Sequence, residues 1–261
     1  MKVAIIGGGF YGCYLAFKLK KHFKSKIEIN IFEKNKKLLD GASNNSQWRL
    51  HLGFHYPRSE ETVNQCVKGS KKFKKDFKRF IFYPKNNLYL IHKNSKTKFK
   101  KFVEIYKKFN LSVERFDLKK INYLKNIKNF SGSIKTKEGV IRFDKLNPFL
   151  RKKIKDNCKI YYNKNIKKIN SFSGDIIDNN QKIYKNYDYI LNCTYTEPNI
   201  GNNKKFSVKY ELAGMVETKN PFKERMAITI MDGPFISIYP RKNNTVSFSS
   251  VKYTPIKKMN S

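Results

Sequence analysis

Several residue types that would define a function are scarce in this 261-residue chain. The four cysteines are widely scattered and form neither a C-x-x-C pair nor any metal-ligand spacing; they are Cys13, Cys66, Cys158 and Cys193. This distribution argues against a disulfide framework and against a bound metal, and it is typical of a reduced, cytosolic protein. No cysteine stands beside a histidine in the sequence, which also disfavours a thiol nucleophile.

Long apolar runs are absent as well. No stretch approaches the roughly 18 apolar residues that a membrane-spanning helix needs. Met1 and Lys2 precede an apolar segment and so resemble a short secretory signal, but three consecutive glycines interrupt that segment. No small-residue cleavage site follows before Lys18. The sequence therefore predicts a soluble, cytoplasmic protein with no membrane span.

Acidic residues are few: the chain has 20 Asp and Glu but 56 Lys and Arg, which gives a formal net charge of +36. Only eight of the basic residues are Arg, and the lysines are spread along most of the chain. Lys, Asn and Ile are all abundant and share AT-rich codons, so base composition explains the excess. Specific readout of nucleic acid favours Arg. We expect weak, salt-sensitive association with polyanions and no specific nucleic-acid partner.

One basic stretch, residues 71–80, is interleaved with aromatic side chains. Phe73, Phe77 and Phe80 recur there at helical spacing. Such spacing indicates a buried stripe on a helix whose basic face is solvated, and this reading is favoured over a nucleic-acid surface.

The most informative feature of the chain is a glycine-rich turn near the N-terminus. Gly7, Gly9 and Gly12 occupy the G-x-G-x-x-G positions between a predicted strand at 2–6 and a predicted helix at 10–23. The first glycine permits a tight turn, the second leaves room for a pyrophosphate, and the third lets the helix approach the sheet. The N-terminus of the helix adds free N–H groups and a favourable dipole for phosphates.

A carboxylate stands at the expected distance from this turn. A second strand, predicted at 27–33, ends at Glu33, roughly 20 residues beyond the last glycine, where an acidic side chain binds ribose hydroxyls. The complete pattern predicts a dinucleotide-binding unit rather than an ordinary strand–helix turn with spare glycines.

The rest of the chain alternates between helical and strand-like patterns. Helices are predicted at 60–78, 96–109 and 146–155, and a hairpin at 80–92 turns at Asn86-Asn87. Strands are predicted at 159–169, 176–184, 188–193, 208–217, 226–231, 235–239 and 245–251. We expect an α/β fold with a Rossmann-like nucleotide-binding subdomain (1–70 and 139–200) interleaved with a smaller, mostly antiparallel substrate subdomain (71–138 and 201–261).

Residues 41–59 are dense in functional side chains and hold two of the four histidines, the only Trp and two of the eight arginines. Together with the glycine-rich turn, this segment resembles the FAD-dependent oxidoreductases typified by D-amino-acid oxidases. The small-residue part contains Ser43 and Asn44, and the pattern R-x-H-x-G-x-x-Y is matched from Arg49 to Tyr56. A later strand, ending at Thr194, resembles the family strand that ends Asn-Ala-Thr-Gly and returns to the cofactor, although Tyr195 stands in place of its glycine.

The resemblance implies that FAD is bound non-covalently. The cofactor-binding residues that it implies, together with the glycine-rich turn, are Gly7, Gly9, Phe10, Tyr11, Gly12, Glu33, Lys34, Ser43, Asn44 and Thr194. The catalytic residues that it implies are Arg49, His51 and Tyr56. His55 and Arg58 are further candidates to bind an anionic group, although Arg58 is also placed to pair with Glu61.

The implied activity is oxidation of a small amine, amino acid or sugar-related metabolite by hydride transfer to flavin. The alternative is a flavin- or nucleotide-binding protein without turnover, and a polyanion-binding protein is less favoured. Nothing in the sequence matches the Gly-rich C-terminal segment that closes over the flavin in this family. We therefore expect that a partner chain or a further segment completes the site.

Overall fold

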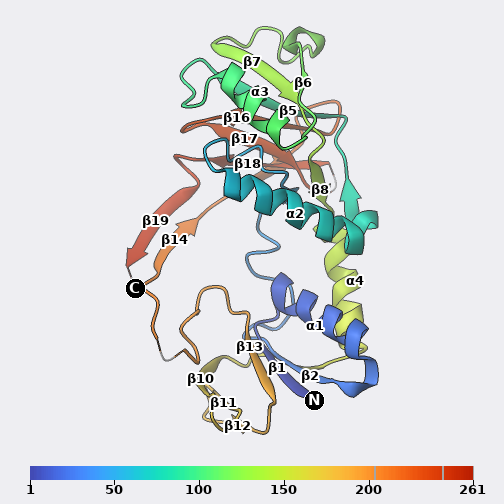
Figure 1. Ribbon diagram of the computed structural model, residues 1–261, viewed down its shortest axis with the longest axis vertical. Helices are drawn as coiled ribbons and strands as arrows, with labels where there is room; N and C mark the ends of the chain where they lie inside the picture. Colours follow the sequence, from blue (N-terminus) through green and yellow to red (C-terminus); the bar gives the residue numbers. More distant parts are fainter. Residues whose placement is uncertain (203, 243, 261) are drawn as a thin grey trace. The chain divides into compact units, whose positions relative to one another are not determined.

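The computed structural model describes residues 1–202, 204–242 and 244–260 (Figure 1). Within these residues the chain forms two compact units, each built from separate stretches of sequence. Unit 1 comprises residues 1–45 and 144–210 with the chain from Met259, and unit 2 comprises residues 46–143 and 211–258. This division departs from the predicted boundaries. Residues 46–70 belong to unit 2, and unit 2, not unit 1, takes the longer share of the chain.

Unit 1 contains a four-stranded parallel sheet in the order β13-β1-β2-β9. Its strands are β1 (Lys2–Ile6), β2 (Glu28–Phe32), β9 (Lys159–Tyr161) and β13 (Tyr189–Asn192). Helix α1 (Phe10–Phe23) connects β1 to β2, and α4 (Phe143–Lys155) precedes β9. Four of the five residues in each of β1 and β2 are buried, as expected for central strands of a parallel sheet. The predicted Rossmann-like β–α–β unit is confirmed.

A smaller antiparallel sheet completes unit 1. It consists of β10 (Ile166–Asn170), β11 (Asp175–Asp178) and β12 (Ile183–Tyr184). The single strand predicted at 159–169 is therefore wrong, because β9 and β10 belong to different sheets. Asn163, between them, has a φ of +54°, and a backbone in this left-handed region ends an extended strand.

Unit 2 is built around a seven-stranded sheet in the order β15-β18-β17-β16-β5-β7-β6. All neighbouring pairs are antiparallel except β16 and β5, which are parallel. The strands are β5 (Asn86–His92), β6 (Glu114–Arg115), β7 (Phe130–Lys135), β15 (Val216–Lys219), β16 (Met226–Met231), β17 (Ile236–Pro240) and β18 (Thr245–Ser250). The mostly antiparallel character expected of the second subdomain agrees with this sheet.

Two helices belong to unit 2. Helix α3 (Phe99–Lys108) buries Phe102, Ile105 and Tyr106 in a core cluster shared with strands β5 and β7. Helix α2 (Glu60–Phe77) begins at Ser59, whose hydroxyl accepts a hydrogen bond from the Thr62 amide at 3.3 Å. Of the predicted aromatic stripe, Phe77 at the end of this helix is buried and Phe73 is half-buried, whereas the buried Phe80 lies in the short 3₁₀ turn that follows.

A three-stranded sheet carries the segment that the sequence singled out. Strand β3 (Arg49–Leu50) and strand β4 (Ile81–Phe82) each pair with β8 (Gly139–Ile141). The hairpin predicted at 80–92 is wrong. Asn86 and Asn87 lie inside β5 rather than in a turn, because their buried amides find partners within the protein. The side-chain amide of Asn87 donates to the backbone carbonyl of Glu138 at 3.0 Å.

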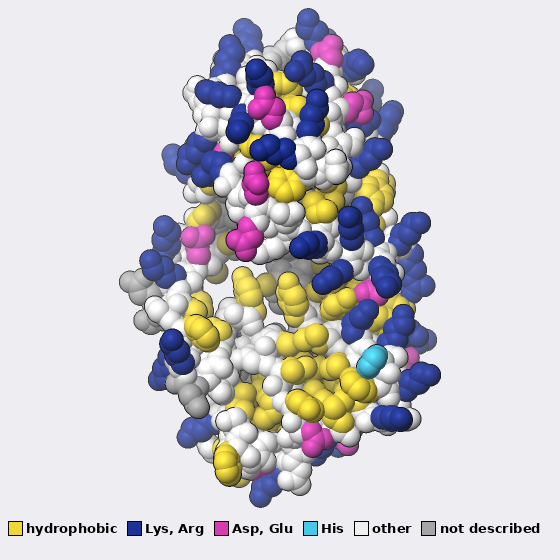
Figure 2. Space-filling model, viewed as in Figure 1, with side chains coloured by type: hydrophobic (Ala, Val, Ile, Leu, Met, Phe, Trp, Pro, Cys, Tyr) yellow, Lys and Arg dark blue, Asp and Glu magenta, His cyan; other side chains and the backbone are white. Residues whose placement is uncertain are grey.

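The remaining elements are short. Strands β14 (Lys209–Ala213) and β19 (Pro255–Asn260) form a two-stranded sheet, and single 3₁₀ turns occur at Lys24–Lys26, Lys78–Phe80 and Leu118–Lys120. Among the described residues, no helix is both long and apolar enough to cross a bilayer. Lys and Arg side chains are scattered widely over the face drawn in Figure 2, with few acidic groups between them.

Candidate functional site

The glycine-rich turn has the geometry that its sequence predicts. Gly7 has a φ of +101°, and a Cβ there would lie 2.5 Å from the Cys193 carbonyl oxygen. A Cβ at Gly12 would overlap the Gly7 carbonyl oxygen. A Cβ at Gly9, in contrast, would meet no described heavy atom within 4 Å. Two of the glycines are therefore required by the fold, and the third leaves an open space in front of α1.

The N-terminus of α1 faces this space. Gly9 is the N-cap residue and, as a glycine, supplies no side-chain cap of its own. The Phe10 amide donates to the Ser43 hydroxyl at 3.3 Å. An N-terminus of this kind offers amide donors and a positive dipole to an anion.

Glu33 lies at the end of β2 and is 6% exposed. One carboxylate oxygen accepts from the Gly8 amide at 2.7 Å and the other from the Asn35 amide at 2.8 Å. Sequence reasoning did not foresee that this carboxylate fixes the glycine-rich turn directly. A carboxylate has about four acceptor positions, so capacity for further hydrogen bonds is left after these two.

These features line one pocket of about 490 Å³ in unit 1. Of the ten predicted cofactor-binding residues, eight lie on its wall: Gly7, Gly9, Phe10, Tyr11, Glu33, Lys34, Ser43 and Thr194. Gly12 does not line the pocket, and the Asn44 side-chain oxygen accepts a hydrogen bond from the side-chain amide of Asn147 at 3.4 Å. Residues that sequence reasoning missed include Asp40, Lys164, Ile166 and Tyr195. Open space before a helix N-terminus beside a buried carboxylate fits a dinucleotide.

In unit 2, Arg49 lies in a buried polar cluster. Its guanidinium is 3.5 Å from the Glu138 carboxylate and donates to the Tyr89 hydroxyl at 2.7 Å. It also donates to the Thr229 hydroxyl at 3.0 Å and lies 4.0 Å from the centre of the Tyr239 ring. Burial raises the pKa of Glu138, although the Arg49 charge opposes this shift. The positive charge of Arg49 is thus matched inside the protein.

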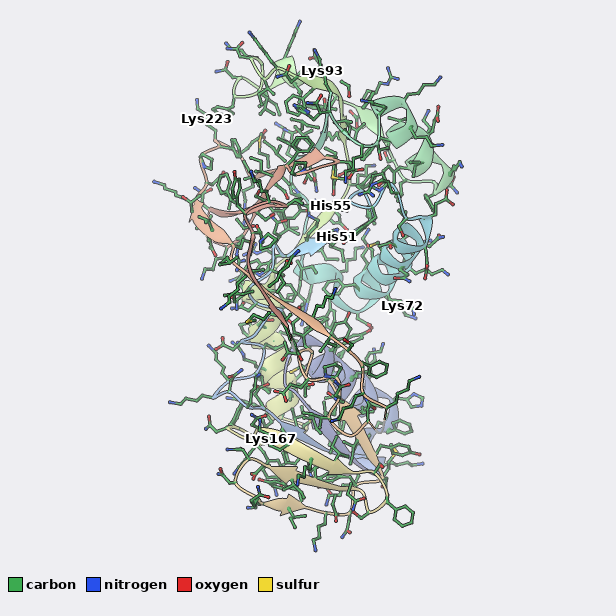
Figure 3. The ribbon with its side chains drawn as sticks, turned by 90° about the vertical axis from the view of Figure 1, so that its left-hand side faces the viewer. His51, His55, Lys72, Lys93, Lys167 and Lys223 are labelled. Carbon is green, nitrogen blue, oxygen red and sulfur yellow. The ribbon has the colours of Figure 1, made fainter. Side chains whose placement is uncertain are left out.

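A pocket of about 610 Å³ lies beside this cluster in unit 2. His51 and Tyr56, two of the predicted catalytic residues, line it together with His55, but Arg49 is not on its wall. The rings of His51 and His55 are 5.2 Å apart, centre to centre, and the two residues are labelled in Figure 3. Arg58 also lines the pocket and donates to the Asp232 carboxylate at 3.0 Å. The observed ion-pair partner of Arg58 is therefore Asp232 and not Glu61, the partner that the sequence offered as an alternative.

The pKa values of both histidines are lowered, so both rings are neutral at neutral pH. Burial, helped by the nearby Arg49 charge, lowers the pKa of His51 to about 3. The same two causes, with His51 added, place the pKa of His55 well below its ordinary value. The His51 Nδ1 atom is buried and has no hydrogen-bond partner within the described residues, and His55 Nδ1 is 2.9 Å from the Tyr89 hydroxyl. His51 is therefore the free hydrogen-bonding group of the pair.

Sequence reasoning missed the groups that hold this cluster together. Glu138 is fully buried, and its carboxylate accepts from the Tyr89 hydroxyl at 2.6 Å and from the Leu52 amide at 2.7 Å. The signal that could have found Glu138 is an acidic side chain directly before an apolar strand, in a chain where acids are scarce.

Comparison with known proteins identifies the family of the chain. The model of the DAO family, described as FAD dependent oxidoreductase, matches residues 2–255. The chain belongs to this family, whose cofactor is FAD, and the resemblance read from the sequence is confirmed.

Two curated relatives are similar to part of the chain. The FAD-dependent monooxygenase kojA of Aspergillus flavus is 35% identical over 89 residues, which are 34% of this chain and 20% of that protein. The FAD-dependent monooxygenase FPY4 of Fusarium mangiferae is 36% identical over 89 residues, again 34% of this chain and 23% of the relative. The matched stretch thus spans about a fifth of the length of these relatives.

Solved structures share the fold over nearly the whole chain. Glycine oxidase from Geobacillus kaustophilus has a TM-score of 0.74 at 14% identity and covers 99% of this chain and 71% of its own. L-alpha-glycerophosphate oxidase from Mycoplasma pneumoniae, solved with FAD bound, has a TM-score of 0.73 at 13% identity. The match covers 95% of this chain and 71% of the oxidase. At such identities the likeness establishes the fold alone.

Proposed function

We propose that unit 1 binds FAD non-covalently and that the chain is an oxidoreductase. The observation that carries the proposal is the pocket of unit 1, where the space in front of Gly9 is open and the Glu33 carboxylate stands beside it. Backbone amides at the N-terminus of α1 would take the pyrophosphate, and Glu33 would accept from the ribose hydroxyls. FAD, when bound, supplies the acceptor for a hydride.

The pocket of unit 2 would hold the substrate. His51 offers a buried Nδ1 atom, and Tyr56, on the same wall, offers a phenol hydroxyl. Since the lowered pKa values keep both histidine rings neutral, the histidines would bind by hydrogen bonds rather than by charge, while Lys96 adds a positive charge to the same wall. A substrate that arrives as a neutral amine or alcohol needs no strong base on the protein to lose a hydride.

The role of Arg49 in this proposal differs from direct contact with the substrate. Its charge is matched by Glu138, and its hydrogen bonds to Tyr89 and Thr229 hold the polar cluster beside the pocket. The charge of Arg58 is likewise paired, with Asp232. We infer a small, polar substrate, of the amine, amino acid or sugar-related class, recognised in part through hydrogen bonds with His51 and Tyr56.

The test is anaerobic reduction of the FAD-loaded protein by a panel of small amines, amino acids and polyols. The proposal expects one class to bleach the flavin absorbance, and expects His51→Gln to slow this bleaching while FAD stays bound. Stoichiometric FAD that no member of the panel reduces would favour a flavin-binding protein without turnover. A protein that binds no FAD would overturn the proposal.

A further inference from the structure

Tyr195, one of the pocket residues of unit 1, has an unusual backbone. The Thr196 amide donates to the Thr194 carbonyl at 2.7 Å, which closes a three-residue turn around Tyr195. The φ of Tyr195 is +64°. A γ-turn with a positive central φ is rare and strained, and the left-handed region favours glycine over any residue with a side chain.

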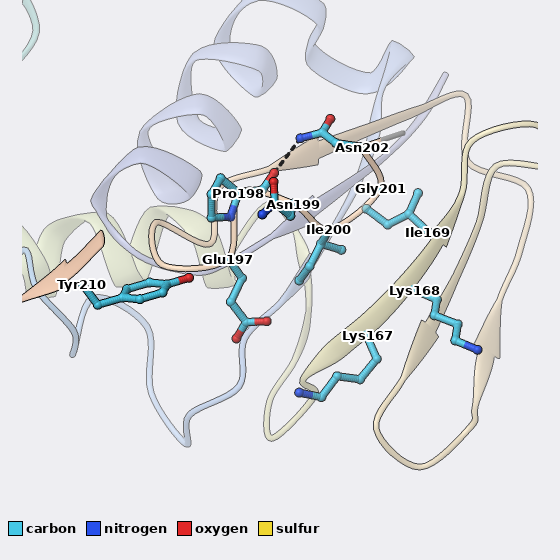
Figure 4. Close-up of a pocket in the computed structure, with 10 residues that line it drawn as sticks. All are labelled: Lys167, Lys168, Ile169, Glu197, Pro198, Asn199, Ile200, Gly201, Asn202 and Tyr210. Carbon is cyan, nitrogen blue, oxygen red and sulfur yellow. Dashed lines mark hydrogen bonds between the residues drawn. The ribbon is translucent and has the colours of Figure 1, made fainter. Parts of the chain in front are cut away.

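Hydrogen bonds on both sides hold this turn in place. The Asn192 side-chain oxygen accepts from the Thr194 amide at 3.1 Å, and the Thr194 hydroxyl donates to the Glu197 carbonyl at 2.9 Å. The Tyr210 hydroxyl donates to the Thr196 carbonyl at 2.8 Å. Figure 4 shows Glu197 and Tyr210 in the neighbouring hollow of about 520 Å³, where the side-chain amide of Asn202 donates to the Pro198 carbonyl at 2.6 Å. Strain that the surroundings enforce in this way is typical of functional positions.

The side chain that the turn presents is a large ring in solvent. Tyr195 is 82% exposed, and within the described residues its hydroxyl has no hydrogen bond and its ring no stacking partner. Tyr195 is one of the residues that line the dinucleotide pocket, as is Tyr11, which is 76% exposed. The preceding residue is close to the glycine-rich turn, since a Cβ at Gly7 would lie 3.2 Å from the Thr194 amide nitrogen.

We propose that Tyr195 stacks on the adenine of the bound dinucleotide, and that the strained turn exists to present its ring there. The inference rests on the proposed binding of FAD. The pocket wall, which includes Glu33 on the ribose side and Ile166, lies wholly in unit 1 and fits the adenosine diphosphate half of the cofactor. An aromatic side chain stacks on a base through its π-face and needs no hydrogen bond from it.

The experiment measures the dissociation constants of ADP and FAD for the full chain and four variants. Tyr195→Leu removes the ring and keeps a side chain on the strained backbone, and we expect both ligands to bind at least about fivefold more weakly. Tyr195→Phe keeps the ring and should bind as the wild type does. Phe172→Leu, at a fully exposed aromatic of unit 1 outside the pocket, is the matched control and should change nothing.

Tyr195→Gly separates binding from stability. It relieves the strained φ, so the Tm should rise by about 2–4 °C, while ADP and FAD bind as weakly as in Tyr195→Leu. Unchanged affinities in both the Leu and Gly variants, with wild-type binding intact, would overturn the stacking role and leave the proposed function standing. A loss confined to FAD would overturn the assignment to adenine. A wild-type chain that bound neither ligand would remove the proposed function and this inference together.

Discussion

At the scale of single residues, the carboxylate of Glu33 combines two tasks. The sequence predicts a ribose-binding acid at this position, and the structure adds that its oxygens hold the amides of Gly8 and Asn35. A change at Glu33 therefore affects both the ligand and the turn that receives the ligand. An experiment on this residue has to separate the two.

We expect Glu33→Ala to weaken FAD binding about tenfold or more, because charge-assisted hydrogen bonds worth roughly 1.5–3 kcal/mol are lost. The measurement is a titration with ADP and with 2′-phospho-ADP. If Glu33 accepts from the ribose hydroxyls, the wild type prefers ADP and the variant loses that preference. An equal loss for both ligands would show that Glu33 only holds the turn.

His51 provides a prediction about pH. Its pKa is about 3 in the folded protein and 6.5 as the ordinary value, so the unfolded chain binds a proton that the folded chain refuses. The contribution to stability is complete above pH 6.5 and is lost progressively as the pH falls toward 3. Between pH 7 and pH 5 this loss is on the order of 2 kcal/mol.

The measurement is urea unfolding of the wild type and His51→Gln at both pH values. The variant lacks the titrating ring, so its stability should fall less than that of the wild type between pH 7 and pH 5. Carboxylates elsewhere titrate equally in both proteins and cancel in the difference. Parallel losses in the two proteins would contradict the neutral, buried ring.

At the scale of elements, local patterns predicted more than long-range pairings. Strand β1, helix α1 and strand β2 were predicted to within a residue at each end, because glycine spacing and apolar runs are local signals. The hairpin at 80–92 was wrong because β4 pairs with β8 and β5 pairs with β7 and β16. The partners of these strands lie about 60 and 140 residues away in the sequence, so a short sequence window does not contain them.

The same contrast applies to the two sites. Eight of the predicted cofactor-binding residues line the pocket of unit 1, and seven of these come from the N-terminal stretch 6–43, whose motifs are local; residues 164–166 and most of 193–197, which come from distant parts of the chain, were not predicted. The cluster around Arg49 was not predicted either, because Tyr89, Glu138 and Thr229 come from three distant strands or turns. Arg49 was predicted as a catalytic residue, and its observed neighbours indicate a positioning role beside the pocket.

The β1–α1 turn gives a prediction with its own control. Gly9→Val places a side chain in open space, so the protein should fold with unchanged Tm yet bind FAD at least about tenfold more weakly. Gly12→Val places its Cβ against the Gly7 carbonyl and should lower the stability by roughly 1–3 kcal/mol. Thermal melts and FAD titrations of both variants check this, and normal FAD binding by Gly9→Val would contradict it.

At the scale of the whole molecule, the formal charge of +36 has a measurable consequence. Because lysines are dispersed, we expect binding to DNA or RNA to be independent of sequence and to fall steeply between 50 and 200 mM salt. Electrophoretic mobility shifts with two unrelated duplexes across that salt range test this expectation. Sequence-selective binding that persisted at the higher salt would revive a nucleic-acid function.

The central claim is that this member of the FAD dependent oxidoreductase family holds the flavin dinucleotide in the pocket of unit 1. The most direct test is the absorbance spectrum of the full chain after incubation with FAD and removal of free ligand, with Gly9→Val treated in parallel. The account predicts the absorption bands of oxidised flavin at close to one FAD per wild-type chain, and their loss in the variant. Equal flavin in both proteins, or none in the wild type, would contradict it.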